Sequence, residues 1–498
     1  MKLLIFMVFV MVSAPVLPQL SVAEIFTDNM LLQREEPISV WGMAAADAEV
    51  EVSFMGRVYK TRADEKGYWE TRLEPQSAQA SPQTLKITAS GEEILLENIL
   101  IGDVWLLIGQ SNMEWPMSGE LFFQEEVKHA DNEELRYYNA QFIGKNIYGQ
   151  AYTPQQREKL ENKEFYEGTW EVSDSASVRG MSAVGYYFGK EINQKAGVPV
   201  GLINLAIGGA PLETFISIET LRDSKQFASK AAGNWLFNED LPDWVRVRGR
   251  ENVGEEKASN DPLGPAHGFR PGYAFETGVA PILQMPIKGI LWYQGESNAQ
   301  EPERVKEYAD LQKLMIEDYR KKWNKPELPF YWVQLSSIDT LNYDSHYWPE
   351  FRDEQRRLLD EVEHVGMAVS SDVGNPNDVH PRNKKAVGKR LARWALNQDY
   401  GKDIVVSGPL PRKAEFKGGK VYISFDHAEG LHASEGNDIK GFSLDGTTQL
   451  FARAEGRKII LESPEKPEYV YYGWSPYSEA NLVNSEELPA STFKLKVD

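Results

Sequence analysis

Residues 104–117 read VWLLIGQSNMEWPM, and the change of character within this segment is the strongest structural signal in the chain. The apolar run at 104–108 is typical of a strand buried on both faces, as in parallel sheets. The run stops at Gly109, and Ser111 follows between a glutamine and an asparagine. Polar groups that directly follow a buried strand are delivered to the edge of a sheet. Ser111 therefore belongs either to a polar turn or to an active site.

Four more apolar runs of strand length follow the first one, and helical segments separate them. Strands are predicted at residues 104–108, 200–206, 287–293, 330–335 and 365–370. Helices are predicted at residues 182–196, 308–323, 351–362 and 384–397. This alternation predicts an α/β domain with an open parallel sheet covered by helices on both faces. In such a domain, ligands bind beyond the carboxyl ends of the strands.

Sequence typical of β-structure flanks this region on both sides. Short alternating runs predict a small antiparallel sandwich as the N-terminal β domain, residues 24–99, and a C-terminal β domain, residues 401–498. The α/β domain is expected to span residues 100–400. Two polar, glycine- and proline-rich stretches, near 141–168 and 227–271, are expected to be long loops or excursions over the site rather than sheet.

Charge, cysteine content and the first residues of the chain restrict the class of protein. With 54 basic and 74 acidic residues the net charge is −20, which argues against nucleic-acid and anionic membrane partners. The chain has no cysteine, so disulfides and thiolate sites are excluded. Residues 1–23 resemble a signal peptide with Ala14 and Ala23 as alternative cleavage positions, and export to a periplasm or outside the cell is expected. The sequence does not indicate an oligomeric state.

Three later segments carry polar residues to the same predicted edge of the sheet as Ser111. The second strand ends at Gly208-Gly209. The third strand is followed by the sequence QGESN, residues 294–298. The loop after the last strand contains Asp372, Asp378 and His380.

A serine nucleophile requires a base, a group that orients the base, and donors for the developing oxyanion. Of the seven histidines, only His380 lies between a core strand and a helix of the α/β region with carboxylates beside it. Ser111 with His380 is therefore the most economical pairing. The backbone N–H groups of Ser111 and Gly209 and the amide of Gln294 are the candidate oxyanion donors. Met113 replaces the second glycine of a Gly-x-Ser-x-Gly elbow, which disfavours the common α/β-hydrolase fold.

Four further residues near these strand ends are candidates for contact with substrate. Trp115 follows the nucleophile closely and could serve as a stacking platform for a sugar. Glu296 is either a structural acceptor that ties loops together or a substrate contact. Gln110 and Asn298 complete this group of candidate binding residues.

Four ordered segments, GDVWLLIGQSNMEW, VGLINLAIGGAPLETF, IKGILWYQGESNA and DVHPRNKKAVGKRLA, resemble the sialate O-acetylesterase family, a branch of the SGNH hydrolases. The resemblance covers residues 102–396. It implies a flavodoxin-like SGNH hydrolase core and the metal- and cofactor-independent removal of O-acetyl groups from sugars by a serine. By position it implies Ser111 as nucleophile, His380 as base, and Gly209 and Gln294 at the oxyanion.

One departure from the family pattern concerns the acid that orients His380. Many SGNH enzymes have an aspartate three residues before the histidine, where this chain has Asn377. Asp378 is only two residues before the histidine, so Asp378, Asp372 or a backbone carbonyl are the alternatives.

Two other functions are compatible with parts of the sequence. A carboxylate-dependent glycosidase would use Glu296 together with a second acid. A non-catalytic glycan-binding protein would use the β domains and leave the loops of Ser111 and His380 unexplained. Within the esterase reading, acetylated sialic acid and acetylated xylan or another hemicellulose are both possible substrates.

Overall fold

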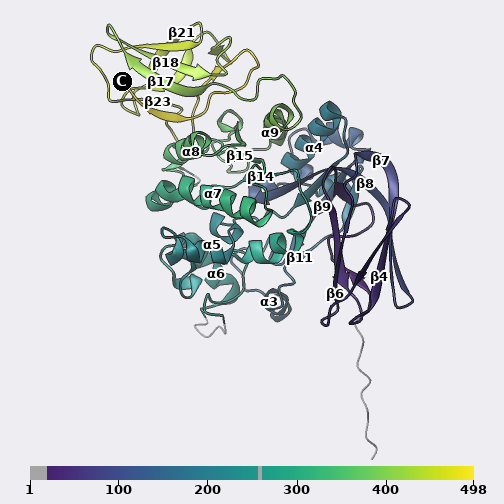
Figure 1. Cartoon of the computed structure of the whole chain (residues 1–498). Helices are drawn as coiled ribbons and strands as arrows, with labels where there is room; N and C mark the ends of the chain where they lie inside the picture. Colours follow the sequence, from purple (N-terminus) through teal and green to yellow (C-terminus); the bar gives the residue numbers. More distant parts are fainter. Residues whose placement is uncertain (1–18, 256–260, 342) are drawn as a thin grey trace, which may run out of the picture.

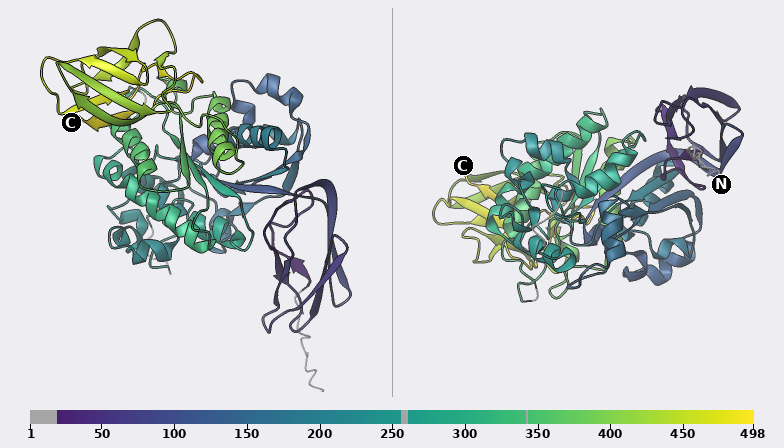
Figure 2. Two further views of the ribbon diagram at one scale, coloured as in Figure 1. Left: turned by 45° about the horizontal axis from the view of Figure 1, so that its top comes forward. Right: turned by 90° about the horizontal axis from the view of Figure 1, so that it is seen from below.

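The computed structural model describes residues 19–255, 261–341 and 343–498. A helix-rich centre is flanked by two β-rich regions (Figure 1). The N-terminal strands and the C-terminal sheet lie on opposite sides of this centre, as the two further views in Figure 2 also show. The mixed α/β architecture with β-rich flanks agrees with the sequence prediction.

All five strands predicted for the central sheet are present and run parallel. They are β8 (Glu92–Gly109), β13 (Val200–Asn204), β14 (Gly289–Tyr293), β15 (Phe330–Gln334) and β16 (Val365–Val369). Their order in the sheet is β13-β8-β14-β15-β16. Numbered among themselves along the chain, this is 2-1-3-4-5, the order of flavodoxin-like sheets. Since β8 has its chain successors on both sides, its carboxyl end lies at the topological switch point, where such folds bind ligands.

The sheet continues beyond β13 with two strands that the sequence did not predict. β9 (Asn132–Asn139) pairs parallel with β13, and β12 (Trp170–Ser173) pairs antiparallel with β9. The sheet is therefore mixed rather than purely parallel. β9 has the sequence NEELRYYN, in which only the second half is buried, so its first half has the polar character of a loop.

Four long helices lie close to their predicted positions. They are α4 (Ala183–Ala196), α7 (Pro302–Lys322), α8 (Trp348–Arg357) and α9 (Lys384–Gln398), and they pack as the pairs α4 with α9 and α7 with α8. Ser182 caps the N-terminus of α4, since its side chain accepts a hydrogen bond from the N–H of Gly185. Gly197, in the left-handed conformation, caps its C-terminus. The short helices are α1 (Ser111–Glu114), α2 (Phe123–Glu126), α3 (Pro154–Glu161), α5 (Ile218–Asp223) and α6 (Asp243–Val253).

The prediction that residues 141–168 and 227–271 are loops or excursions rather than sheet was wrong for two short strands of the first stretch, and neither stretch was expected to hold a helix. The first stretch contains α3 and a two-stranded sheet of β10 (Gln141–Phe142) and β11 (Tyr166–Glu167). The second stretch contains α6. Both helices were missed because they bury few residues; Leu160 is the one buried side chain of α3. An amphipathic pattern needs more apolar positions than that to be visible.

The N-terminal region is joined to the central sheet through a shared strand. Its strands are β1 (Ser21–Val22), β2 (Leu31–Gln33), β3 (Ile38–Met43), β4 (Glu49–Phe54), β5 (Arg57–Arg62), β6 (Tyr68–Leu73) and β7 (Gln79–Ala89). β7 pairs antiparallel with the first part of β8, whereas β2 pairs parallel with its middle. The N-terminal sandwich is thus not purely antiparallel. The boundary placed after residue 99 falls inside β8, because one continuous strand serves both regions.

The C-terminal region forms a separate antiparallel sheet with its own core. Its strand order is β17-β18-β22-β21-β20-β23-β25. Ile423, Phe442 and Phe493 are among its buried residues, which form a cluster distinct from the main core. The strands are β17 (Leu410–Phe416), β18 (Lys420–Asp426), β20 (Ile439–Ser443), β21 (Leu450–Glu455), β22 (Lys458–Glu462), β23 (Tyr469–Tyr472) and β25 (Phe493–Lys496), with β19 (His432–Ala433) and β24 (Leu482–Val483) forming a small second sheet.

The predicted signal peptide falls mostly on residues 1–18, outside the described residues. Ser21 and Val22 form β1, which pairs with Met43 and Gly42 of β3. Cleavage at Ala23 would therefore remove a strand, whereas cleavage at Ala14 would retain it. No helix in the described ranges is long and apolar enough to cross a membrane.

The end of β8 requires a glycine, which gives a first testable prediction. Gly109 has a φ of +135°, and a Cβ at this position would lie 2.2 Å from the carbonyl oxygen of Tyr293. We expect Gly109→Ala to force β14 away from β8 and to lower the free energy of unfolding by about 1–3 kcal/mol. Urea unfolding measures the change. Gly180→Ala is the matched control, because the nearest atom to its new Cβ would be 3.7 Å away; equal stability losses in the two variants would refute the argument.

Candidate active site

The structure brings Ser111 and His380 into direct contact. Ser111 is the first residue of α1, two positions after the end of β8, and His380 lies in the loop between β16 and α9. The Nε2 atom of His380 is 2.9 Å from the Oγ of Ser111. With the ring proton on Nδ1, the serine hydroxyl donates to Nε2, which is the geometry that a serine nucleophile and its base require.

Asp378 is the carboxylate that lies beside the imidazole. Its Oδ1 accepts a hydrogen bond from the backbone N–H of His380 at 2.8 Å and lies 3.5 Å from Nδ1 of the ring. Asp372 is held elsewhere, since Arg390 donates to both of its carboxylate oxygens at 2.7 Å. Of the two aspartates considered from the sequence, the geometry favours Asp378 as the group that orients the ring.

The Gly208-Gly209 turn lies next to the nucleophile. The N–H of Ile207 donates to the carbonyl of Gly109 at 3.0 Å, which fixes this turn beside the end of β8. Gly209 has a φ of +75°, and its Cβ would contact Trp244 at 2.9 Å. Among the described residues, no acceptor is recorded for the backbone N–H of Ser111 or of Gly209. These two N–H groups are therefore free to donate to an oxyanion.

Gln294 is buried behind this turn, and its amide is engaged. Its Nε2 donates to Asn298 at 2.7 Å and to the carbonyl of Ala210 at 3.3 Å. Its Oε1 accepts from the hydroxyl of Tyr308 at 2.8 Å. Both amide hydrogens thus stabilise the loops in this structure, and neither is directed at Ser111.

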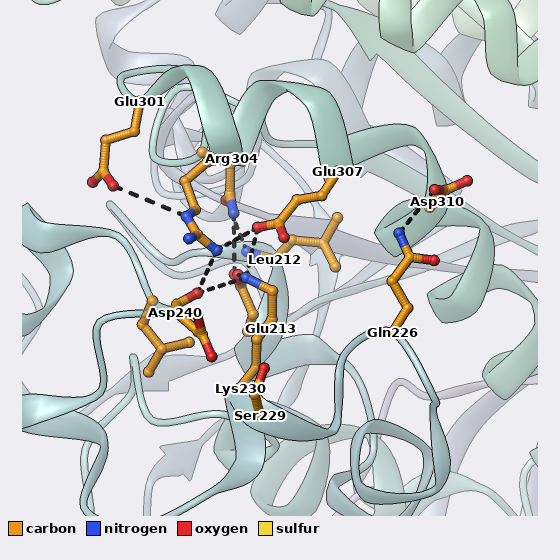
Figure 3. A network of polar contacts seen from close by, with 12 residues as sticks. Leu212, Glu213, Gln226, Ser229, Lys230, Asp240, Glu301, Arg304, Glu307 and Asp310 are labelled. Carbon is orange, nitrogen blue, oxygen red and sulfur yellow. Dashed lines mark hydrogen bonds and ion pairs between the residues drawn. The ribbon is translucent and has the colours of Figure 1, made fainter.

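Asn298 is also part of the scaffold rather than the surface of the site. Its Oδ1 accepts from the N–H of Leu212, and its Nδ2 donates to Glu213. Asn298 therefore ends a chain of polar contacts. In this chain Glu213 accepts from Lys230, which also donates to Glu307 (Figure 3). The chain ties the loop after β14 to the segment after β13 and to α7.

Gln110 and Glu296 connect the loops in the same way. The Oε1 of Gln110 accepts from the N–H groups of Gly295 and Ser297 at 3.4 and 3.2 Å. Glu296 is only 2% exposed and accepts a hydrogen bond from the side chain of Asn112. A glycosidase carboxylate must contact the sugar, and Glu296 is too deeply buried to do so. Glu296 was predicted to be either a structural acceptor or a substrate contact, and the structure favours the structural acceptor.

Trp115 packs against His380. Its ring stacks on the imidazole of His380, with the ring centroids 5.1 Å apart and the planes at 20°. The two excursions predicted from the sequence border the other side of the site. A Cβ on Gly208 would lie 3.1 Å from the hydroxyl of Tyr148, and Trp244 contacts Gly209 as described above. Residues of 141–168 and 227–271 thus lie against the Gly208-Gly209 turn.

Comparison with known proteins gives the family. The model of the carbohydrate esterases described as sialic acid-specific acetylesterases matches residues 101–229 and 277–397. The chain belongs to this family. It is 26% identical to the sialate O-acetylesterase of Rattus norvegicus, over 84% of this chain and 81% of that protein, and 25% identical to that of Homo sapiens, over 85% and 79%. It is also 30% identical to a carbohydrate acetylesterase from Xanthomonas citri, whose crystal structure matches 95% of this chain and 99% of that one with a TM-score of 0.77.

Burial and two charges set the protonation of His380 in this carbohydrate esterase. Burial lowers the pKa of the imidazole, and the ammonium of Lys384 lowers it further, while Asp378 raises it. A lowered pKa keeps the ring neutral, the form in which it can accept a proton.

Lys384 is the residue near the site that the sequence analysis missed. It is fully buried, and burial lowers its pKa to about 7 against the opposing effect of Glu296, Asp378 and Glu120. One signal was available: a lysine as the first residue of a helix is unfavourable with the helix dipole. Its burial could not be inferred, because Lys385 and Lys389 are on the same helix and are not buried.

The chain of contacts in Figure 3 yields a second prediction. Lys230 is 2% exposed and is 2.9 Å from Glu213 and 2.6 Å from Glu307. We expect Lys230→Met to lower the free energy of unfolding by about 3–5 kcal/mol, because it leaves a buried carboxylate without its partner. Urea unfolding of this variant is compared with that of Lys225→Met, whose lysine is exposed on the same segment. A Lys230→Met protein as stable as the control would show that the network contributes little.

Proposed function

We propose that this carbohydrate esterase removes O-acetyl groups from sugars through an acetyl-enzyme formed on Ser111. The distance of 2.9 Å between Ser111 Oγ and His380 Nε2, at the carboxyl end of β8, is the observation that carries the proposal. The free N–H groups of Ser111 and Gly209 beside it supply what acyl transfer requires in addition.

The proposed reaction has two halves. In the first, Nε2 of His380 takes the Ser111 proton while Oγ attacks the acetyl carbonyl, and the tetrahedral oxyanion accepts from the N–H groups of Ser111 and Gly209. The imidazolium then gives its proton to the departing sugar oxygen. In the second half, His380 deprotonates a water molecule that attacks the acetyl-enzyme, and acetate leaves as the proton returns to Ser111.

Gln294 has a supporting role in this proposal. Sequence position places it with the oxyanion donors, yet its amide hydrogens are bound to Asn298 and Ala210. Ala210 follows Gly209 directly, so the contact with Ala210 holds the N–H of Gly209 in place. In this assignment two backbone groups receive the negative charge, and Gln294 keeps one of them in position.

The strand order 2-1-3-4-5 and the place of Ser111 after the first of these strands support our assignment of the centre to the SGNH hydrolase type. We further assign residues 1–23, on sequence alone, to a leader that directs export, followed by the N-terminal β domain, the α/β domain and the C-terminal β domain. The N-terminal sequence of the mature protein, recovered from a periplasmic or culture fraction, tests the leader.

The substrate we propose is an acetylated carbohydrate. The relatives from Rattus norvegicus and Homo sapiens are named sialate O-acetylesterases, which favours acetylated sialic acid, and the similar structure from Xanthomonas citri is named only a carbohydrate acetylesterase. Acetate release from O-acetylated sialic acid, measured beside release from acetylated xylan, distinguishes the two classes.

Replacement of the nucleophile is the direct test of this function. We expect Ser111→Ala to lower kcat for acetate release by roughly 10⁴-fold or more, because no other group can form the acetyl-enzyme. Ser118→Ala, an exposed serine of the same loop, is the matched control. A folded Ser111→Ala enzyme with wild-type turnover would refute the mechanism.

The identity of the orienting acid gives a fourth prediction. Asp378 is 45% exposed and 3.5 Å from Nδ1, so water already screens its charge. We expect Asp378→Asn to lower kcat by roughly 10- to 100-fold, less than the loss of about 10⁴-fold seen when a buried triad aspartate is replaced. Asp372→Asn should leave kcat near the wild-type value. If only the Asp372 variant loses activity, the assignment of the two aspartates must be exchanged.

A further inference from the structure

Three polar side chains are buried directly beneath the catalytic pair, and the reaction described above uses none of them. They are Lys384 at the start of α9, Asn112 next to Ser111, and Glu296 after β14. Their residues are 0%, 0% and 2% exposed. We refer to them as the buried cluster.

Asn112 is the centre of the buried cluster. Its Nδ2 donates to the carboxylate of Glu296 and to the backbone carbonyl of Val379, the latter at 3.0 Å. Its Oδ1 accepts from the ammonium of Lys384. Asn112 follows Ser111 in the chain, and Val379 precedes His380. One amide therefore joins the backbone that carries the nucleophile to the backbone that carries the base.

Lys384 occupies a costly position, which argues against a purely structural role. Its ammonium is buried in the first turn of a helix, where the helix dipole disfavours positive charge. It lies 5.7 Å from the ring centroid of Trp115 and 5.5 Å from that of Tyr293. Apolar residues of similar volume often replace buried ion pairs without loss of stability. An interaction that aligns reacting groups is a reason to keep the charge.

We propose that Lys384 is a positioning residue of the esterase reaction: by holding Asn112 in one orientation, it fixes the loop of Ser111 against the loop of His380. This inference rests on the Ser111–His380 assignment made above. Without the ammonium, Oδ1 of Asn112 loses its donor, so the amide is held only through Nδ2 and its contact with Val379 is weakened. The distance between Oγ and Nε2 then varies.

The charge of Lys384 also acts on the pKa of His380. Its removal should therefore change the pH dependence of activity, which the loss of a purely structural contact would not do. The titratable groups that act on His380 are Lys384, which lowers the imidazole pKa, and Asp378, which raises it. Lys384 itself faces Glu296, Asp378 and Glu120. When the ammonium is removed, its lowering effect on the imidazole pKa is lost while the raising effect of Asp378 remains, so the pKa of His380 rises. Because the neutral imidazole is the active form, the acidic limb of kcat/KM moves to higher pH.

The experiment compares Lys384→Met, Asn112→Ala and the double variant, with acetate release from a generic acetyl ester as the assay. We expect each single variant to lower kcat by roughly 10- to 100-fold, the scale of a misaligned reacting group, with KM within about threefold of the wild type. We expect the double variant to be no slower than the slower single variant, because both act through one contact. Lys389→Met, on the exposed part of the same helix, should retain wild-type kinetics.

The variants are accepted for comparison once their thermal unfolding shows a folded protein. If Lys384→Met fails to fold, Lys384→Met/Glu296→Gln removes both buried charges together and takes its place. A folded variant of either kind with wild-type kcat and an unmoved acidic limb overturns the inference, as does a double variant whose losses simply multiply. Ser111→Ala, assayed in parallel, separates this outcome from a failure of the proposed function, which only an active Ser111→Ala enzyme would indicate.

Discussion

The contact between Ser111 and His380 joins residues that are 269 positions apart in the chain. Both residues are close to fixed structure: Ser111 is two positions after β8, and His380 is four positions before α9. Ser111 follows β8, and His380 precedes α9, which packs against the sheet and α4. A parallel sheet brings the carboxyl ends of its strands to one edge and keeps them there. The rest of the site depends on this rigid edge, since an oxyanion hole is useful only when its donors are correctly placed beforehand.

Behind that edge, hydrogen bonds between buried polar side chains hold the loops together, whereas apolar packing does so elsewhere in the core. Gln110, Asn112, Gln294 and Asn298 are all buried, and each bonds to a different loop from its own. Hydrogen bonds have directional requirements that dispersion contacts lack, so such networks specify one arrangement of the loops. Such networks can also destabilise the fold, because a buried polar group that lacks a hydrogen-bond partner lowers the free energy of unfolding.

The residues around Ser111 and His380 come from two kinds of segment. Ser111 and Gly209 follow central strands and His380 lies in the loop after β16, whereas Tyr148 and Trp244 come from residues 141–168 and 227–271. Excursions of this kind can change in length and sequence without moving the strands beneath them. Specificity in this chain is accordingly expected in residues 141–168 and 227–271.

The sequence by itself determined the five core strands, the four long helices and the set of residues at the strand ends. These features depend on local periodicity and on the rule that polar residues after buried strands reach one edge, so no three-dimensional information was needed. The tertiary structure alone decided which of those polar residues are engaged with other loops and which are not. Glu296, Asn298 and Gln110 look as functional as Ser111 in the sequence, yet they turn into the protein and bind other loops. Three further features could not be predicted from the sequence: the edge strands β9 and β12, the continuity of β8 across two regions, and the burial of Lys384. Each of them depends on what packs against the segment rather than on the composition of the segment itself.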